Sequence, residues 1–221
     1  MKKHGIKAGI GLVLAVILTA CSSMEYAVRE RFGQHKRELL VERVGDAKES
    51  QVEAKEQFVD ALTRFKEVSN FRGGVLEAQY DLLNNEYKDC ERRADEVHKR
   101  IAAVQDVARA LFKEWSEELA QYTSSQLRDA SELRLNETRR AADQLLTSMR
   151  NAERRMTPVL NTFRDQVLFL KHNLNARAVA SLGNVALELQ QDINALVNDM
   201  ERAIDEANRF IETMQADSSE S

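Results

Sequence analysis

Apolar residues recur at alternating intervals of three and four along almost the whole chain, and this spacing constrains the fold more than any other feature. The clearest run has an apolar residue at ten successive positions of this spacing: Leu182, Ala186, Leu189, Ile193, Leu196, Met200, Ala203, Ala207, Phe210 and Met214. With 43% hydrophobic residues in the chain, chance would give ten of ten in about two of ten thousand trials. The interval is that of one helix face that packs in coiled-coil fashion.

Residues that break helices are scarce. One proline and eight glycines in 221 residues leave little for the tight turns of sandwiches, barrels or chains of small domains. The glycine pair at 73–74 predicts one turn, and the Thr-Ser-Ser run at 123–125 predicts a second with helix-capping hydroxyls. At Pro158 the apolar stripe shifts frame but resumes at once, which predicts a kinked, continuous helix.

A third turn is predicted at 173–175, although this segment contains no glycine. Asn173 is suited to a left-handed cap, Leu174 to folding back on the preceding turn, and Asn175 to capping the following helix. The alternative is one uninterrupted helix over 126–214, about 130 Å long at 1.5 Å per residue.

These breaks predict an all-α fold: an elongated antiparallel bundle of three to four long amphipathic helices with coiled-coil packing. The expected helices are 24–69, 75–122, 126–173 and 175–214. Helices of this length would form a rod of about 60–70 Å. We expect one bundle domain over 21–214 and a disordered polar tail over 215–221.

Residues 1–20 have the character of a lipoprotein signal peptide. The apolar segment 8–17 is shorter than the ~20 residues that span a bilayer, and it follows three cations, Lys2, Lys3 and Lys7. It leads into Leu18-Thr19-Ala20-Cys21, which resembles the bacterial lipobox.

The lipobox resemblance implies cleavage before Cys21 and acylation of both its sulfur and the new amino terminus. Several acyl chains would give stable anchoring, and Ser22, rather than aspartate, in the next position implies the outer membrane. The alternative is an ordinary secretory signal with a coincidental cysteine.

Charge is nearly balanced, with 32 Lys and Arg against 36 Asp and Glu and a net charge of −4. Residues 1–20 carry three lysines and no acid, so the chain from Cys21 has 29 cations against 36 anions, or −7. This balance argues against a dedicated nucleic-acid binder. Basic doublets such as Arg92-Arg93 stand beside acids, which is typical of a solvated helix face.

Chemical motifs are absent from the sequence. The three histidines of the body, His35, His98 and His172, lie singly on different predicted helices, and no phosphate-binding or nucleophile motif occurs. We therefore expect no catalytic residue, metal, cofactor or nucleotide. Cys90 falls on the apolar stripe, which favours a small buried side chain; cross-linking of two chains is the alternative.

Two groups of stripe residues have additional roles to consider. Tyr80, Tyr87 and Trp115 share one predicted helix; core packing is the default, and an interaction strip that holds a lipid, small ligand or polymer is the alternative. Gln51 is the one polar member of the first stripe and is expected to set register. That stripe comprises Val44, Ala47, Gln51, Ala54, Phe58, Ala61, Phe65 and Val68.

Three runs, 36–41 (KRELLV), 71–74 (FRGG) and 167–178 (VLFLKHNLNARA), resemble an uncharacterised family of Gram-negative lipoproteins known only as a domain of unknown function. The resemblance covers about 24–214 and implies an all-helical, coiled-coil-rich envelope lipoprotein. It brings no catalytic or ligand residues.

We therefore expect a periplasm-facing lipoprotein of the outer membrane with a structural or adaptor role. Its expected partners are the membrane, through the lipid anchor, and an envelope protein or a second copy of the chain. The alternative is an envelope binding module with a groove along the aromatic helix.

Overall fold

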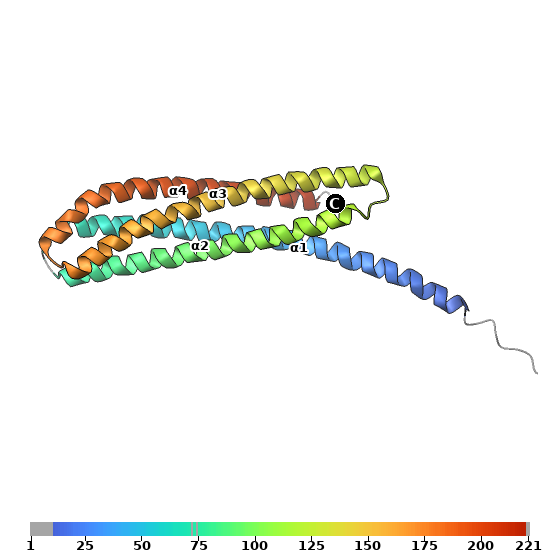
Figure 1. Ribbon diagram of the computed structural model, residues 1–221, viewed down its shortest axis with the longest axis horizontal. Coiled ribbons are helices and arrows are strands. Elements are labelled where there is room, and N and C mark those ends of the chain that lie inside the picture. The colour runs from blue at the N-terminus through green and yellow to red at the C-terminus, as the bar shows by residue number, and fades with distance from the viewer. Residues whose placement is uncertain (1–10, 72, 74, 220–221) are drawn as a thin grey trace, which may run out of the picture.

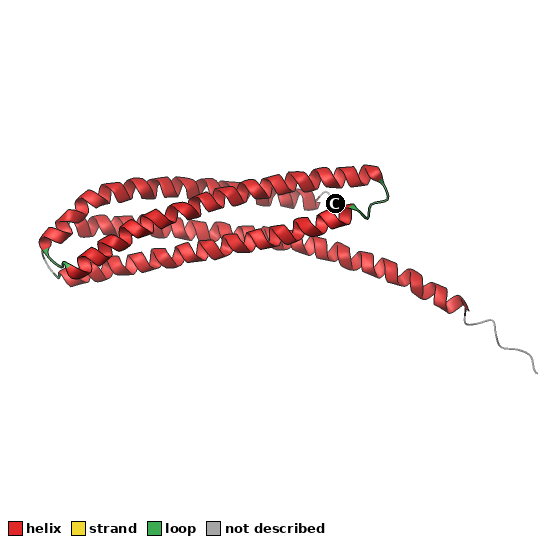
Figure 2. Cartoon of the chain, viewed as in Figure 1, coloured by secondary structure: helices red, strands yellow, loops and turns green. Residues whose placement is uncertain are grey.

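The computed structural model describes residues 11–71, 73 and 75–219, and side chains from residue 35 to residue 216 apart from 72, 74 and 176. The described part consists of four long α-helices: α1 (Gly11–Ser69), α2 (Leu76–Leu119), α3 (Ser125–His172) and α4 (Ala176–Ser219). Figure 1 shows them as an elongated antiparallel bundle, and Figure 2 shows that short connections alone separate them. The predicted all-α fold class is confirmed.

The helices form a ring in which each one packs against two neighbours. α1 packs against α2 and α4, and α3 packs against the same two helices. The buried residues form one continuous cluster along the bundle axis. Toward the end of the bundle where α1 and α3 end, Phe65 of α1 meets Phe163 of α3 edge to face, with ring centroids 5.6 Å apart at 77°. The diagonal helices therefore also touch through large side chains.

The apolar stripes line this core as predicted. All ten positions from Leu182 to Met214 in α4 are buried, and so are all eight positions from Val44 to Val68 in α1. In α3 the buried line passes from Met156 through Val159 to Phe163. The stripe therefore continues through Val159 rather than Leu160, and the frame shift predicted at Pro158 is not needed.

The three predicted turns are present. Gly73 adopts φ +87°, in the left-handed region that favours glycine. The Ser124 hydroxyl caps α3 by accepting from the amide of Leu127 at 3.4 Å. α2 ends at Leu119, three residues earlier than predicted, and Tyr122 lies 41% exposed in the connection.

The third turn differs from its prediction in detail. Asn175 caps α4, its Oδ1 accepting from the amide of Ala178 at 3.0 Å, as expected. Asn173, however, has φ −134° and ψ 53° and is not left-handed. Its side-chain amide donates to the carbonyl of Phe169 at 3.0 Å, which satisfies the α3 terminus without a left-handed residue. Leu174 is 42% exposed and does not fold back.

Two other features of the helices bear on the predictions. α3 runs through Pro158 without a break, as expected, with Pro158 on its exposed side. α4 continues past Met214 to Ser219, so the backbone of 215–219 is helical where a disordered tail was expected. The reason is local, because the residues after Met214 include no glycine or proline that would end a helix.

α1 is enclosed more completely than a helix on the surface of a bundle usually is. Between Leu40 and Phe58 only three residues are exposed, Glu42, Glu49 and Glu56, one in every seven. Small side chains such as Ala47 and Ala54 face the core here and let the neighbouring helices approach closely. In this segment of α1 the three glutamates are therefore the most exposed residues.

Gln51 lies inside this enclosed segment. Its side chain is fully buried, and neither Oε1 nor Nε2 has a hydrogen-bond partner among the described residues. A buried polar group without a partner destabilises the folded state because its hydration is lost without replacement.

Replacement of Gln51 by leucine is expected to stabilise the fold. Q51L removes the unpaired amide at similar volume, so the free energy of unfolding should rise by about 1–3 kcal/mol, measured as a higher urea midpoint at constant slope. The matched control Q191L, at an exposed position of α4, should change it by less than about 0.5 kcal/mol. A lower midpoint for Q51L would show that the amide is satisfied in solution.

Candidate functional site: the N-terminal arm, the aromatic residues and the α1–α2 seam

The first part of α1 projects beyond the bundle. We call residues 11–35 the N-terminal arm; it leaves the bundle at the end where the α2–α3 connection and the C-terminus lie (Figure 1). Leu18, Thr19, Ala20 and Cys21 lie on the helical backbone of this arm, and their side chains are outside the described set. Residues 1–10 of the expected signal peptide lie outside the described residues altogether.

The arm joins the bundle at a cluster of contacts with the last turns of α2. Lys36 forms an ion pair with Glu114, and the guanidinium of Arg37 stacks over the indole of Trp115, 4.2 Å from the ring centroid. Along a straight helix, Cys21 lies about 22 Å before Lys36. None of the described helices is long and apolar enough to cross a membrane.

The aromatic side chains of α2 fall into two separate environments. Tyr80 and Tyr87 are half-buried, and the ring of Tyr87 meets Phe163 edge to face with centroids 6.2 Å apart. The Tyr87 hydroxyl donates to Glu91 at 2.8 Å. Burial, followed by this hydrogen bond and the charge of Glu91, raises the pKa of Tyr87.

Trp115 lies near the other end of α2, about 42 Å from Tyr87 along the helix axis. It is 7% exposed, and its indole N–H donates to the hydroxyl of Ser131 in α3 at 2.9 Å. With Arg37 over its face, the ring is held by α1 and α3 together. The structure therefore does not bring Tyr80, Tyr87 and Trp115 into one site.

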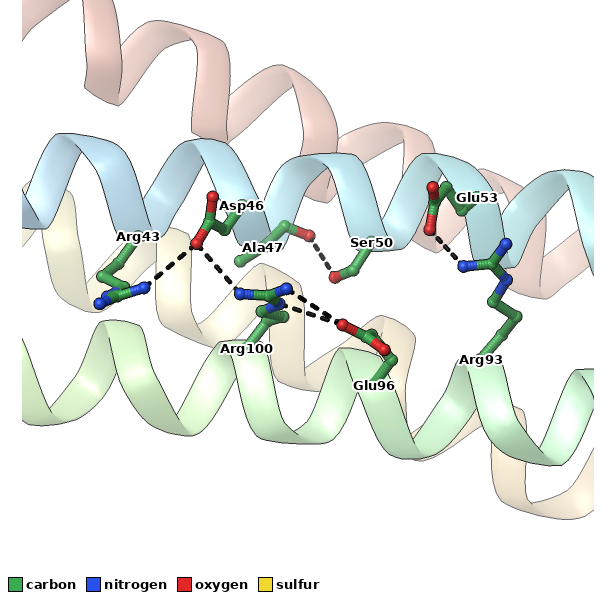
Figure 3. Close-up of polar contacts among 8 residues, drawn as sticks. All are labelled: Arg43, Asp46, Ala47, Ser50, Glu53, Arg93, Glu96 and Arg100. Carbon is green, nitrogen blue, oxygen red and sulfur yellow. Dashed lines mark hydrogen bonds and ion pairs between the residues drawn. The ribbon is translucent and has the colours of Figure 1, made fainter.

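Charged side chains join α1 to α2 along a seam that we define by Arg43, Asp46, Glu53, Arg93, Glu96 and Arg100 (Figure 3). Asp46 accepts from Arg43 at 3.3 Å and from Arg100 at 3.1 Å. Arg100 also contacts Glu96 at 3.2 Å, and Arg93 pairs with Glu53 across the interface. Three cations thus face three anions.

The sequence does not predict the α1–α2 seam as a feature that joins two helices. It predicts a solvated helix face for the doublet Arg92-Arg93, and this is correct for Arg92, which is exposed and pairs with Asp89 at 2.8 Å on its own helix. Arg93 instead crosses to α1. The heptad position of Arg93, next to the apolar stripe, was the available signal, because side chains flanking a stripe reach the neighbouring helix.

The other interfaces also carry polar contacts between helices. These contacts join Lys55 to Glu201 (α1–α4), His98 to Glu153 (α2–α3) and Arg155 to the buried Asp199 (α3–α4). Partly exposed pairs of this kind contribute little stability each, about 0–1 kcal/mol. Their geometric effect is larger, because they fix how far each helix has slid along its neighbour.

Cys90 is fully buried, with Sγ 3.8 Å from the carbonyl oxygen of Gln57. Burial, and then the charges of Glu86 and Asp89, raise the pKa of its thiol to about 12. Since the thiolate is the reactive species, Cys90 has the environment of a packed apolar side chain rather than of a nucleophile or a cross-linking group.

The histidines remain apart in space. His35 and His172 are exposed, and His98 contacts Glu153 on the adjacent helix. Over the residues that the structure describes, no group of three His, Cys, Asp or Glu side chains is arranged to hold a metal ion.

These features define an extended four-helix bundle with one helix prolonged beyond its end. The chain belongs to the family described as a protein of unknown function (DUF2959), whose model matches residues 25–214. This match confirms membership of an uncharacterised family, and the all-helical fold agrees with what the resemblance implied. No curated protein and no solved structure matches the chain.

The buried thiol of Cys90 is expected to be unreactive in the folded protein. In a C21S background, where Cys90 is the only cysteine, iodoacetamide labelling at pH 8 should be about 10³-fold slower than for a free cysteine, from the raised pKa alone. Labelling should stay slow at pH 9, because the thiol remains protonated until the pH approaches about 12. Urea unfolding should restore normal reactivity; rapid labelling without urea would contradict the buried position.

Proposed function

We propose that the protein is a lipoprotein of the outer membrane that faces the periplasm, held by lipid on Cys21. Its role is structural or that of an adaptor: a rod that presents helix surfaces to an envelope protein or to a second copy of the chain. The proposal assigns it no catalytic step, nucleotide or cofactor.

One observation carries the proposal. Leu18-Thr19-Ala20-Cys21 follows a short apolar segment in the sequence, and its backbone lies on the arm that projects from the bundle (Figure 1). Because the backbone of this arm projects from the bundle, a lipid attached to the arm would not need to disturb the packed core. The chain has a charge of −7 from Cys21 onward, so the body has no general electrostatic attraction to an anionic membrane. Attachment to the membrane would therefore depend on the lipid.

The second candidate is a module that binds a lipid, small ligand or polymer along the aromatic helix. The half-buried position of Tyr80 and Tyr87 is the observation in its favour. Against it, Tyr87 is engaged by Phe163 and Glu91, and Trp115 is occupied by Arg37 and Ser131. The adaptor role is therefore the better supported of the two.

Replacement of Cys21 by serine is expected to abolish lipidation. Serine cannot form the thioether, so C21S should incorporate no labelled palmitate and should accumulate as the uncleaved precursor, seen as a larger band on a gel. The matched variant C90S should label like the wild type, because Cys90 is buried in the core. Undiminished palmitate incorporation by C21S would refute the anchor.

The single tryptophan separates the two candidate functions. Trp115 is 7% exposed, so acrylamide should quench its fluorescence far less in the folded protein than in urea. S131A removes the hydrogen bond to the indole and should shift the emission with little loss of helicity. Quenching of the folded protein close to that in urea would place the indole in an open groove and favour the binding module.

A further inference from the structure

The end of the bundle opposite the N-terminal arm carries exposed apolar side chains. The α1–α2 and α3–α4 connections both lie at this end (Figures 1 and 2). We call it the distal tip. Its large exposed apolar residues are Val75 at 68%, Leu168 at 48%, Phe169 at 43% and Leu174 at 42%. A gathering of this kind differs from singly scattered surface residues, which need no explanation.

Exposed cations accompany these apolar residues. Lys171 and His172 lie in the last turn of α3, where the helix dipole favours positive charge. Arg177 lies in the first turn of α4, which contains no acidic residue, and there the dipole disfavours a cation. Neither Lys171 nor Arg177 has an ion-pair partner among the side chains described here. The helix dipole therefore explains why cations occur at Lys171 and His172, but it does not explain the cation at Arg177.

The form of the distal tip favours a bilayer over a partner helix. A partner helix usually docks its apolar face into a groove, whereas these four residues lie in or beside the two connections at one end of a rod (Figure 2). Protruding apolar side chains can enter the boundary between headgroups and acyl chains, and neighbouring cations can reach lipid phosphates.

The charge of the rest of the chain indicates which end of the bundle would approach an anionic membrane. Acidic residues outnumber basic ones, 36 to 32, in the whole sequence, and α4 alone has eight acidic against three basic residues. An anionic surface repels such a body. At the distal tip the exposed Lys171 and Arg177 outnumber Glu77, the exposed acidic residue in the first turn of α2, so the bundle would approach the surface end-on, with the tip first.

We propose that the distal tip binds the surface of an anionic lipid bilayer. Val75, Leu168, Phe169 and Leu174 enter the interface, and Lys171 and Arg177 contact the phosphates. The anchoring half of this inference rests on the proposed lipidation of Cys21. Because the arm leaves from the opposite end (Figure 1), a protein anchored in one membrane contacts a second membrane with its tip and bridges the two.

Vesicle bridging by the lipidated protein tests this proposal. The purified lipoprotein is inserted into neutral phosphatidylcholine vesicles, and incorporation is confirmed by flotation. Acceptor vesicles with phosphatidylglycerol are then added, and clustering is followed by light scattering. We expect clustering that requires phosphatidylglycerol, weakens with salt, and falls about tenfold or more in K171E/R177E and in F169S/L174S.

The matched controls alter the same residue types at other exposed positions. L127S/L133S removes two exposed leucines near the opposite end of the bundle, and K113E/R154E reverses two exposed cations outside the tip. Both should cluster vesicles as the wild type does, and circular dichroism should show every variant folded.

The outcomes separate the two proposals. Failure of the protein to float with the neutral vesicles refutes the lipid anchor. Normal flotation without clustering, or clustering that the tip variants retain, refutes the membrane contact of the tip. Clustering between two protein-loaded neutral populations would mean that the tip meets a second copy of the chain, and would likewise overturn the bilayer as its partner.

Discussion

Four narrow apolar stripes meet along one axis, and the rest of the structure depends on that contact. A stripe that repeats every seven residues does not by itself determine how far one helix slides past another, because a shift of one repeat restores a similar packing. Polar contacts beside the core remove this ambiguity. Pairs such as Asp46 with Arg100 and Arg155 with Asp199 join specific turns of neighbouring helices, and comparable contacts occur at all four interfaces between neighbours.

The enclosure of α1 limits which surfaces of the bundle other molecules can contact. α2 and α4 cover this helix so that from Leu40 to Phe58 only Glu42, Glu49 and Glu56 are exposed, and the other residues are buried or half-buried. The outer faces of α2, α3 and α4 and the two ends of the bundle are then the available contact areas. Of the three runs that carried the family resemblance, 167–178 and the described residues Phe71 and Gly73 of the run 71–74 lie at the distal tip, far from the third run, 36–41.

Periodic features of the fold could be predicted from the sequence, and features that depend on a partner helix could not. The ten buried positions of α4 follow from spacing alone. The conformation of Asn173 does not, because a helix end can be satisfied by a left-handed residue or by a side-chain amide. The crossing of Arg93 to Glu53 depends on the register between α1 and α2, which no local pattern contains. The separation of Tyr87 from Trp115 was available from helix geometry.

The continuity of α1 has a mechanical consequence. One helix runs from the arm that carries Cys21 to Ser69 at the other end of the bundle. A pull on the arm acts along this axis, so the contacts of α1 with α2 and α4 are loaded in shear and resist together rather than opening one after another. Rupture under such a load is governed by the unfolding rate, and the whole interlocked length of α1 must slip at once.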